Sequence, residues 1–181
     1  MKYNRCAQSL VAKKHIGFHR IKSFVTSLSF LIFGVFLTPI TQAASVEVQW
    51  TETEKYRDVK AGTGSSKKFR ERTFKTLEKH LTKLAARLPE TQLLKVNVTD
   101  LDLAGRIDYV SNNSIRVVKE IDIPSIEFSY QLLNADESVD KSGEVDLKDM
   151  NFMRHTSLKY NHESLSYEKR MLESWFYKTF K

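Results

Sequence analysis

The segment LKVNVTDLDL, residues 94–103, is the most informative part of the chain for its fold. Apolar and polar residues alternate over its first five positions, which is typical of a β-strand with one buried face. The alternation changes parity at Asp100, because Leu101 and Leu103 then occupy the apolar positions. A one-residue shift moves every later side chain to the other face of a strand. We therefore predict a β-bulge or a strand end near Asp100.

Further segments with the same alternation predict the partners of this strand. They lie at residues 46–50, 115–123, 126–132 and 139–147. Turn-forming residues separate most of them, as expected for strands that pair with their neighbours in sequence.

Two segments have the periodicity of amphipathic helices instead. Over residues 69–88, apolar side chains recur at steps of three and four, and Pro89 ends the pattern. A second apolar face lies near the C-terminus and contains Leu165, Met171, Leu172, Trp175 and Phe176. The order β-α-β-β-β-β-α predicts an α+β fold, with a largely antiparallel sheet of about five strands and both helices packed on one face.

Three local patterns resemble a known family. They are TDLDLAG at residues 99–105, PSI at 124–126 with Tyr130, and YEKRML at 167–172 with the pair WF at 175–176. With a leader and an N-terminal strand, they are similar to the exported bacterial family known as domain of unknown function 3016. The resemblance covers nearly all of the chain after the leader. It implies export and a single domain, and it brings no activity and no catalytic residues.

The first 43 residues have the pattern of a cleavable signal peptide. A basic region precedes the apolar run FVTSLSFLIFGVFL, residues 24–37, which is shorter than the ~20 residues that span a bilayer. Thr41 and Ala43 then supply small residues at the positions that a signal peptidase requires. We expect cleavage between Ala43 and Ala44.

A periplasmic location follows from this expectation, with residues 44–181 as a single α+β domain that has no transmembrane segment. An uncleaved membrane anchor is the alternative. The basic region is long for a signal peptide. Either the leader is extended, or translation starts at a non-Met codon near Ile21.

The basic charge of the chain belongs to the leader. The whole chain has 29 Lys and Arg against 22 Asp and Glu. Six of the basic residues and none of the acidic ones precede residue 44, which leaves 23 against 22 for the remainder. We therefore expect no nucleic-acid binding, which depends on neutralising several phosphates. The one cysteine, Cys6, also lies in the leader, so the mature part has no disulfide and no cysteine ligand.

Asp100, Asp102 and Gly105 match the first, third and sixth positions of a calcium-binding loop. That loop also needs an oxygen ligand at position five and a glutamate at position twelve, where this chain has Ala104 and Ser111. We predict no metal and no cofactor here. The two aspartates are interpreted as solvated carboxylates on one face of a strand end, where a partner could bind them.

Three short patterns match elements of the penicillin-recognising enzymes in the correct order. They are SSKK at residues 65–68, SNN at 111–113 and KSG at 141–143. That fold buries its serine in a helical subdomain, whereas only two helices are predicted here. We therefore interpret Ser65, or Ser66, as the N-cap of the first helix.

Basic residues recur at helical spacing along the first predicted helix. They are Lys68, Arg72, Lys75, Lys79, Lys83 and Arg87. A ridge of this kind is commonly a solvated helix face. Lys75, Lys79 and Lys83 are its candidate contacts with an anionic partner, such as lipid headgroups or acidic glycans.

The sequence contains no convincing nucleophile–base pair and no metal-ligand set. The favoured function is a non-catalytic envelope module that binds a protein, glycan or lipid surface. The alternative is a small periplasmic hydrolase that uses either Ser65 with Lys68 or Asp100 with Asp102.

Overall fold

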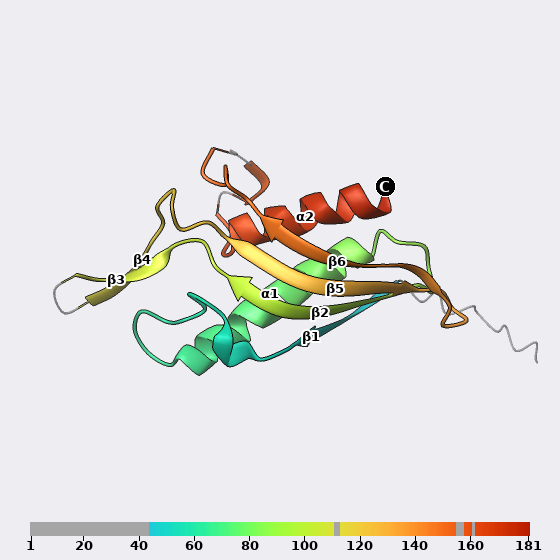
Figure 1. Ribbon diagram of the computed structural model, residues 1–181, viewed down its shortest axis with the longest axis horizontal. Helices are drawn as coiled ribbons and strands as arrows, with labels where there is room; N and C mark the ends of the chain where they lie inside the picture. The colour runs from blue at the N-terminus through green and yellow to red at the C-terminus, as the bar shows by residue number, and fades with distance from the viewer. Residues whose placement is uncertain (1–43, 111–112, 155–157, 161) are drawn as a thin grey trace, which may run out of the picture. The chain divides into compact units, whose positions relative to one another are not determined.

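The computed structural model describes residues 44–110, 113–154, 158–160 and 162–181. The predicted signal peptide and residues 111–112 of the predicted turn lie outside this part of the chain. Within it, the elements follow the order β1, α1, β2, β3, β4, β5, β6, α2 (Figure 1). The α+β class and the two helices are confirmed.

The strands are β1 (Ser45–Trp50), β2 (Leu93–Asp102), β3 (Arg106–Val110), β4 (Asn113–Val117), β5 (Ser125–Leu133) and β6 (Val139–Lys148). The helices are α1 (Ser66–Ala85) and α2 (Ser166–Phe180), with short 3-10 helices at Thr53–Lys55 and Leu158–Tyr160.

Four of the strands form the main sheet, in the order β1-β2-β5-β6. β1 and β2 are parallel, and α1 provides the long connection that a parallel pair needs. The pairs β2–β5 and β5–β6 are antiparallel. The predicted largely antiparallel sheet is therefore confirmed.

β2 is irregular where its sequence changes parity. Val98 pairs with Phe128, but Asp100 pairs with the adjacent Glu127, so Thr99 is the extra residue of a bulge. The bulge keeps both halves of the apolar pattern on the buried side of the sheet. Val98 before it and Leu101 after it are each at most 2% exposed. The bulge predicted near Asp100 is confirmed.

Both helices bury their apolar stripes against the same face of the sheet. Leu77 and Leu81 of α1 and Trp175 of α2 belong to one core cluster, together with inward-facing residues of β2 and β5. The Trp175 ring meets the Phe128 ring edge-on, with 4.8 Å between their centroids. Figure 1 shows α1 passing behind the strands, and no described helix covers the opposite face. Neither helix combines the length and the apolar character needed to cross a bilayer.

The strand predicted at residues 115–123 is correct only in its first part. β4 ends at Val117 and pairs with β3, a strand that the alternation did not reveal, in a separate two-stranded sheet. Ile121 lies in the turn that follows and is 73% exposed, so its apolar side chain does not mark a buried strand face. The described residues thus contain six strands where about five were predicted. The β3–β4 hairpin projects from one end of the main sheet (Figure 1).

Candidate functional site

The side of α1 that faces away from the sheet is strongly basic. α1 contains seven Lys and Arg against two glutamates, a net charge of +5. Since residues 44–181 carry +1 in total, the rest of this segment carries −4. The charge of the domain is therefore separated, with the positive part concentrated on one helix.

Lys75, Lys79 and Lys83 are exposed on this helix. Among the described residues, none of the three forms an ion pair with a carboxylate. One of the two glutamates of α1, Glu78, accepts a hydrogen bond from the Trp50 indole at 2.8 Å, which holds it beside the sheet. The lysines of α1 are therefore free to meet an external anion.

Asp100 and Asp102 lie together at the end of β2, on the face of the sheet that the helices leave open. The Arg57 guanidinium bridges them, with 3.7 Å from Nη2 to Asp100 and 3.5 Å from Nε to Asp102. Across the sheet, Asp100 is in register with Glu127, and Glu127 with Asp146. The interpretation of two carboxylates on one face of a strand end thus matches the geometry.

The environment of Asp102 differs from the solvated one that was expected. Its side chain is only 17% exposed, and burial raises its pKa, against the effect of Arg57. No group of three or more His, Cys, Asp or Glu among the described residues is arranged to hold a metal ion. The two aspartates form a small ion-paired patch, and their role in binding remains a prediction.

A buried carboxylate, Glu168, joins the start of α2 to the loop after β2. It is 2% exposed, and one of its oxygens accepts a hydrogen bond from the Ala104 N–H at 2.8 Å. Burial raises the pKa of Glu168. Two of the sequence patterns that resemble a known family therefore meet in space at this contact. Their spacing in the sequence gave no sign that Glu168 is buried.

The Arg116 side chain connects the base of the β3–β4 hairpin to neighbouring segments. Its guanidinium donates hydrogen bonds to the backbone carbonyls of Gly105, Asp58 and Lys60, and it lies over the Phe69 ring at 5.6 Å. These contacts connect the hairpin to the loop before α1 and to the end of β2. Periodicity placed Arg116 at an ordinary polar strand position, so the sequence did not indicate this role.

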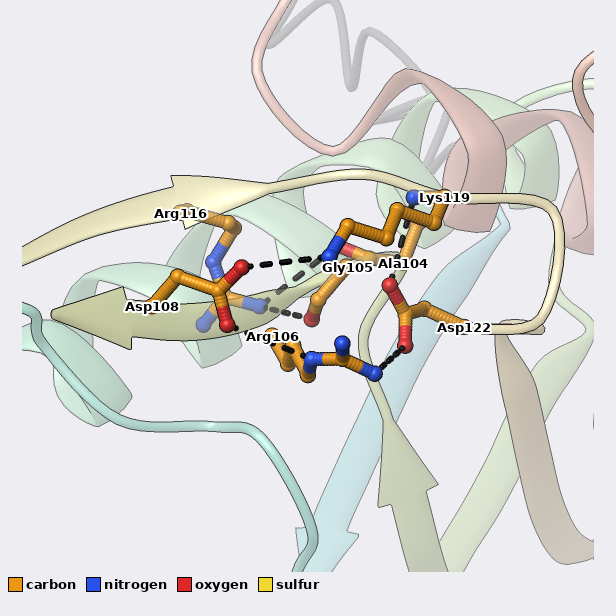
Figure 2. A network of polar contacts seen from close by, with 7 residues as sticks. All are labelled: Ala104, Gly105, Arg106, Asp108, Arg116, Lys119 and Asp122. Atoms are coloured by element: carbon orange, nitrogen blue, oxygen red, sulfur yellow. Dashed lines mark hydrogen bonds and ion pairs between the residues drawn. The ribbon is translucent and has the colours of Figure 1, made fainter. Parts of the chain in front are cut away.

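Ion pairs extend this network along the hairpin (Figure 2). Arg106 contacts Asp108 at 3.3 Å and Asp122 at 3.2 Å, and Lys119 contacts Asp108 at 3.3 Å. These groups are paired with one another and lie near backbone carbonyls. The arrangement fixes a loop against a hairpin and presents no unpaired nucleophile or base.

The serine before α1 acts as a helix cap. The Ser65 hydroxyl accepts a hydrogen bond from the Lys68 N–H at 3.3 Å, so the predicted N-cap is confirmed. Lys141 lies near the start of β6 and donates to the Thr179 carbonyl near the end of α2. Figure 1 shows the start of α1 and the start of β6 at opposite ends of the sheet. The described members of the penicillin-type pattern therefore do not converge, and Ser111 lies outside the described residues.

His80 of α1 is a buried structural group. It is 7% exposed, and its Nε2 lies 2.9 Å from the Lys169 carbonyl, to which the ring N–H donates. The ring also meets the Tyr160 ring edge-on. Burial lowers the pKa of His80, so the folded state resists its protonation.

This burial predicts a pH dependence of stability. The unfolded chain protonates this histidine near its ordinary pKa of about 6.5, while the folded state does so only at lower pH. The contribution of His80 to the free energy of unfolding is therefore fully present above about pH 6.5 and is lost as the pH falls below that value. In urea titrations at about pH 7 and pH 5.5, a His80→Gln variant should lose less stability than the wild type. Equal losses would show that His80 does not carry this dependence.

The open face of the sheet is concave and polar. A hollow of 690 Å³ lies over its four strands. The polar residues that line it are Glu47, Gln49, Lys95, Asn97, Ser129, Gln131, Ser142 and Glu144. This face points away from the helices and, with Glu127 and Asp146 beside it, is predominantly acidic.

Comparisons with known proteins place these features in context. A family model described as "Protein of unknown function (DUF3016)" matches residues 44–178. No curated protein matches the chain. Among solved structures, the 2.35 Å crystal structure of a minor lipoprotein from Acinetobacter baumannii aligns with 77% of this chain and 89% of that chain. The alignment has 8% sequence identity and a TM-score of 0.24, a likeness too weak to relate the two functions.

Proposed function

This chain belongs to the DUF3016 family of proteins of unknown function, and we propose that it is an exported, non-catalytic envelope module. In this proposal, α1 binds anionic lipid headgroups. The signal-peptide pattern of residues 1–43 supports export to the periplasm. The lysine ridge of α1 supports the choice of ligand.

The observation that carries this proposal is the unpaired state of Lys75, Lys79 and Lys83. A surface lysine that is ion-paired with a carboxylate has little net attraction for an external anion, but none of these three forms an ion pair among the described residues. They lie at steps of four, so they point to the same side of the helix. At 1.5 Å per residue they span about 12 Å, which is suited to an extended charged surface.

The opposite charge of the open sheet face favours one orientation. The helices pack on one face of the sheet, and the acidic residues line the other. An anionic surface attracts α1 and repels the open face. The domain would therefore lie with α1 toward the headgroups and the sheet directed away.

Vesicle binding tests the proposal. The purified protein should sediment with vesicles of phosphatidylcholine and phosphatidylglycerol and remain in solution with phosphatidylcholine alone. Each lysine near an anionic membrane contributes about 1 kcal/mol. Changing Lys75, Lys79 and Lys83 together to glutamate removes about 3 kcal/mol of attraction and adds repulsion, so it should weaken binding by at least about 100-fold. Higher salt should weaken wild-type binding, because the contacts are exposed.

A control variant separates the position of the charges from their number. Lys55, Lys95 and Lys148 are also exposed and lie outside α1, so changing them to glutamate alters the net charge by the same amount. This variant should bind the anionic vesicles nearly as well as the wild type. Equal loss in both triple variants would show that net charge alone governs binding, which would contradict the role of α1.

A further inference from the structure

A groove of 1150 Å³ lies between β6 and α2. β6 contributes Val145 and Leu147, which face the core but are only partly buried, and α2 contributes Trp175. α2 therefore leaves part of the inward face of β6 uncovered. This surface is separate from the basic ridge of α1.

β6 is also an edge of the sheet, because its one neighbour in the described sheet is β5. The Asp149 N–H donates to the Pro124 carbonyl across the β5–β6 ladder at 3.4 Å. Hydrogen bonds to a neighbouring strand alternate along an antiparallel ladder. The N–H and C=O groups of Ser142, Glu144, Asp146 and Lys148 are thus directed to the free edge.

The wall of the groove on the α2 side is cationic. Lys178 of α2 and Arg154 of the preceding loop are both exposed, and neither has an ion-pair partner among the described residues. Arg170 lies in the same wall and is paired with Asp149 at 3.0 Å. Glu144 and Asp146 of β6 also border the groove, but their side chains lie on the open face of the sheet, away from this wall.

We propose that the groove binds an extended segment of another protein, which adds to the edge of β6 as a further strand and directs acidic and apolar side chains toward α2. The backbone groups at the edge of β6 supply hydrogen bonds, as in other cases of strand addition. Every second side chain of the added strand points into the groove, where Val145 and Leu147 favour apolar groups and Lys178 favours a carboxylate.

A second copy of this chain is a poorer occupant of the same edge. When the β6 strands of two molecules pair antiparallel about Glu144, the Glu144 carboxylate of one molecule lies opposite that of the other. When the two strands pair about Val145, Glu144 of one molecule lies opposite Asp146 of the other. Like charges directly opposite one another destabilise a strand pair, so the side chains of β6 disfavour these registers.

Three labelled decapeptides serve as probes, since ten residues match the length of β6. Threonine occupies every second position in all three peptides. The positions between the threonines alternate valine with one other residue, which is glutamate in the first peptide, lysine in the second and glutamine in the third. In fluorescence anisotropy with the purified protein, the glutamate peptide should bind at least about tenfold more tightly than the lysine peptide. Equal affinities, or no binding of any probe, would overturn the proposal.

Two substitutions at one position separate backbone pairing from side-chain charge. Glu144→Pro removes an N–H that points to the free edge and leaves the bonds to β5 intact, so it should reduce binding of the glutamate peptide more than tenfold. Glu144→Gln keeps the N–H and should bind as the wild type does. Lys178→Glu should remove the preference for the glutamate peptide, whereas Lys75→Glu on α1 should not.

Hydrogen exchange gives a readout that does not depend on a proline variant folding. Addition of the glutamate peptide should protect the amides of Glu144 and Asp146 and leave those of β1, the other edge of the sheet, unchanged. Binding that leaves the β6 amides unprotected would overturn strand addition. A concentration-dependent dimer that is lost in Glu144→Pro would identify a second copy as the occupant and would also overturn it.

Discussion

Replacing Glu168 by alanine is expected to lower the free energy of unfolding by about 2–4 kcal/mol. The substitution removes the acceptor of the Ala104 N–H and leaves that donor buried, since Ala104 is 6% exposed. It also leaves a small void at the start of α2. Chemical denaturation of the purified variant measures the loss, and a change below about 0.5 kcal/mol, typical of a surface substitution, would contradict the structural role of Glu168.

Glu168→Gln is the matched control, because the amide oxygen can still accept from Ala104. Its cost should be smaller, and its effect should depend on pH. Burial raises the pKa of Glu168, so the folded state favours the protonated carboxyl. The contribution of Glu168 to the free energy of unfolding is fully present below its pKa in the unfolded chain. It is lost as the pH rises through its pKa in the folded state. The advantage of the wild type over Glu168→Gln should therefore shrink as the pH rises, and a pH-independent difference would refute this assignment.

Gly105→Ala is expected to lower the free energy of unfolding by about 3–4 kcal/mol. Gly105 has a φ of +80°, a region that L side chains rarely adopt, and a Cβ there would lie 2.6 Å from the Val117 carbonyl oxygen. The clash falls at the corner where β2 leads into the hairpin, so it also disturbs the carbonyls that Arg116 binds. Thermal and urea denaturation would both report the loss.

Gly64→Ala provides the control for backbone strain alone. Gly64 has a similar φ of +87°, but a Cβ there would meet nothing within 4 Å. Its cost should be about 1–2 kcal/mol, from the positive φ. The difference between the two variants measures the steric clash at Gly105. Equal costs would show that the approach of Val117 is unimportant.

The hairpin shows why alternation in a sequence is not sufficient evidence for a buried strand. Tyr109 and Ile115 have the apolar character of strand residues, yet they are 82% and 49% exposed. β3 and β4 pair only with each other in the described sheets, and the main sheet does not extend over these two side chains. Hydrophobic periodicity reports burial only where another layer exists to bury the residues.

The class of the fold, both helices and the bulge in β2 could be predicted from the amino-acid sequence alone. These features depend on local periodicity and on the parity of one strand, which can be read along the chain. The sequence also determined that α1 would carry Lys75, Lys79 and Lys83 on one side, because helical spacing alone places them there.

Which side chains and backbone groups contact one another depends on the three-dimensional packing of the chain. Glu168 is 64 residues from Ala104, and Arg116 is 58 residues from Asp58, and in both pairs the acceptor or the donor is a backbone group. Backbone N–H and C=O groups are present at nearly every residue, so no side-chain pattern marks the ones that will be used. The groove beside β6 likewise depends on where α2 comes to lie across the sheet. That position is set by the packing of Trp175 against Phe128 and Tyr130, and long-range packing of this kind leaves no periodic trace in the sequence.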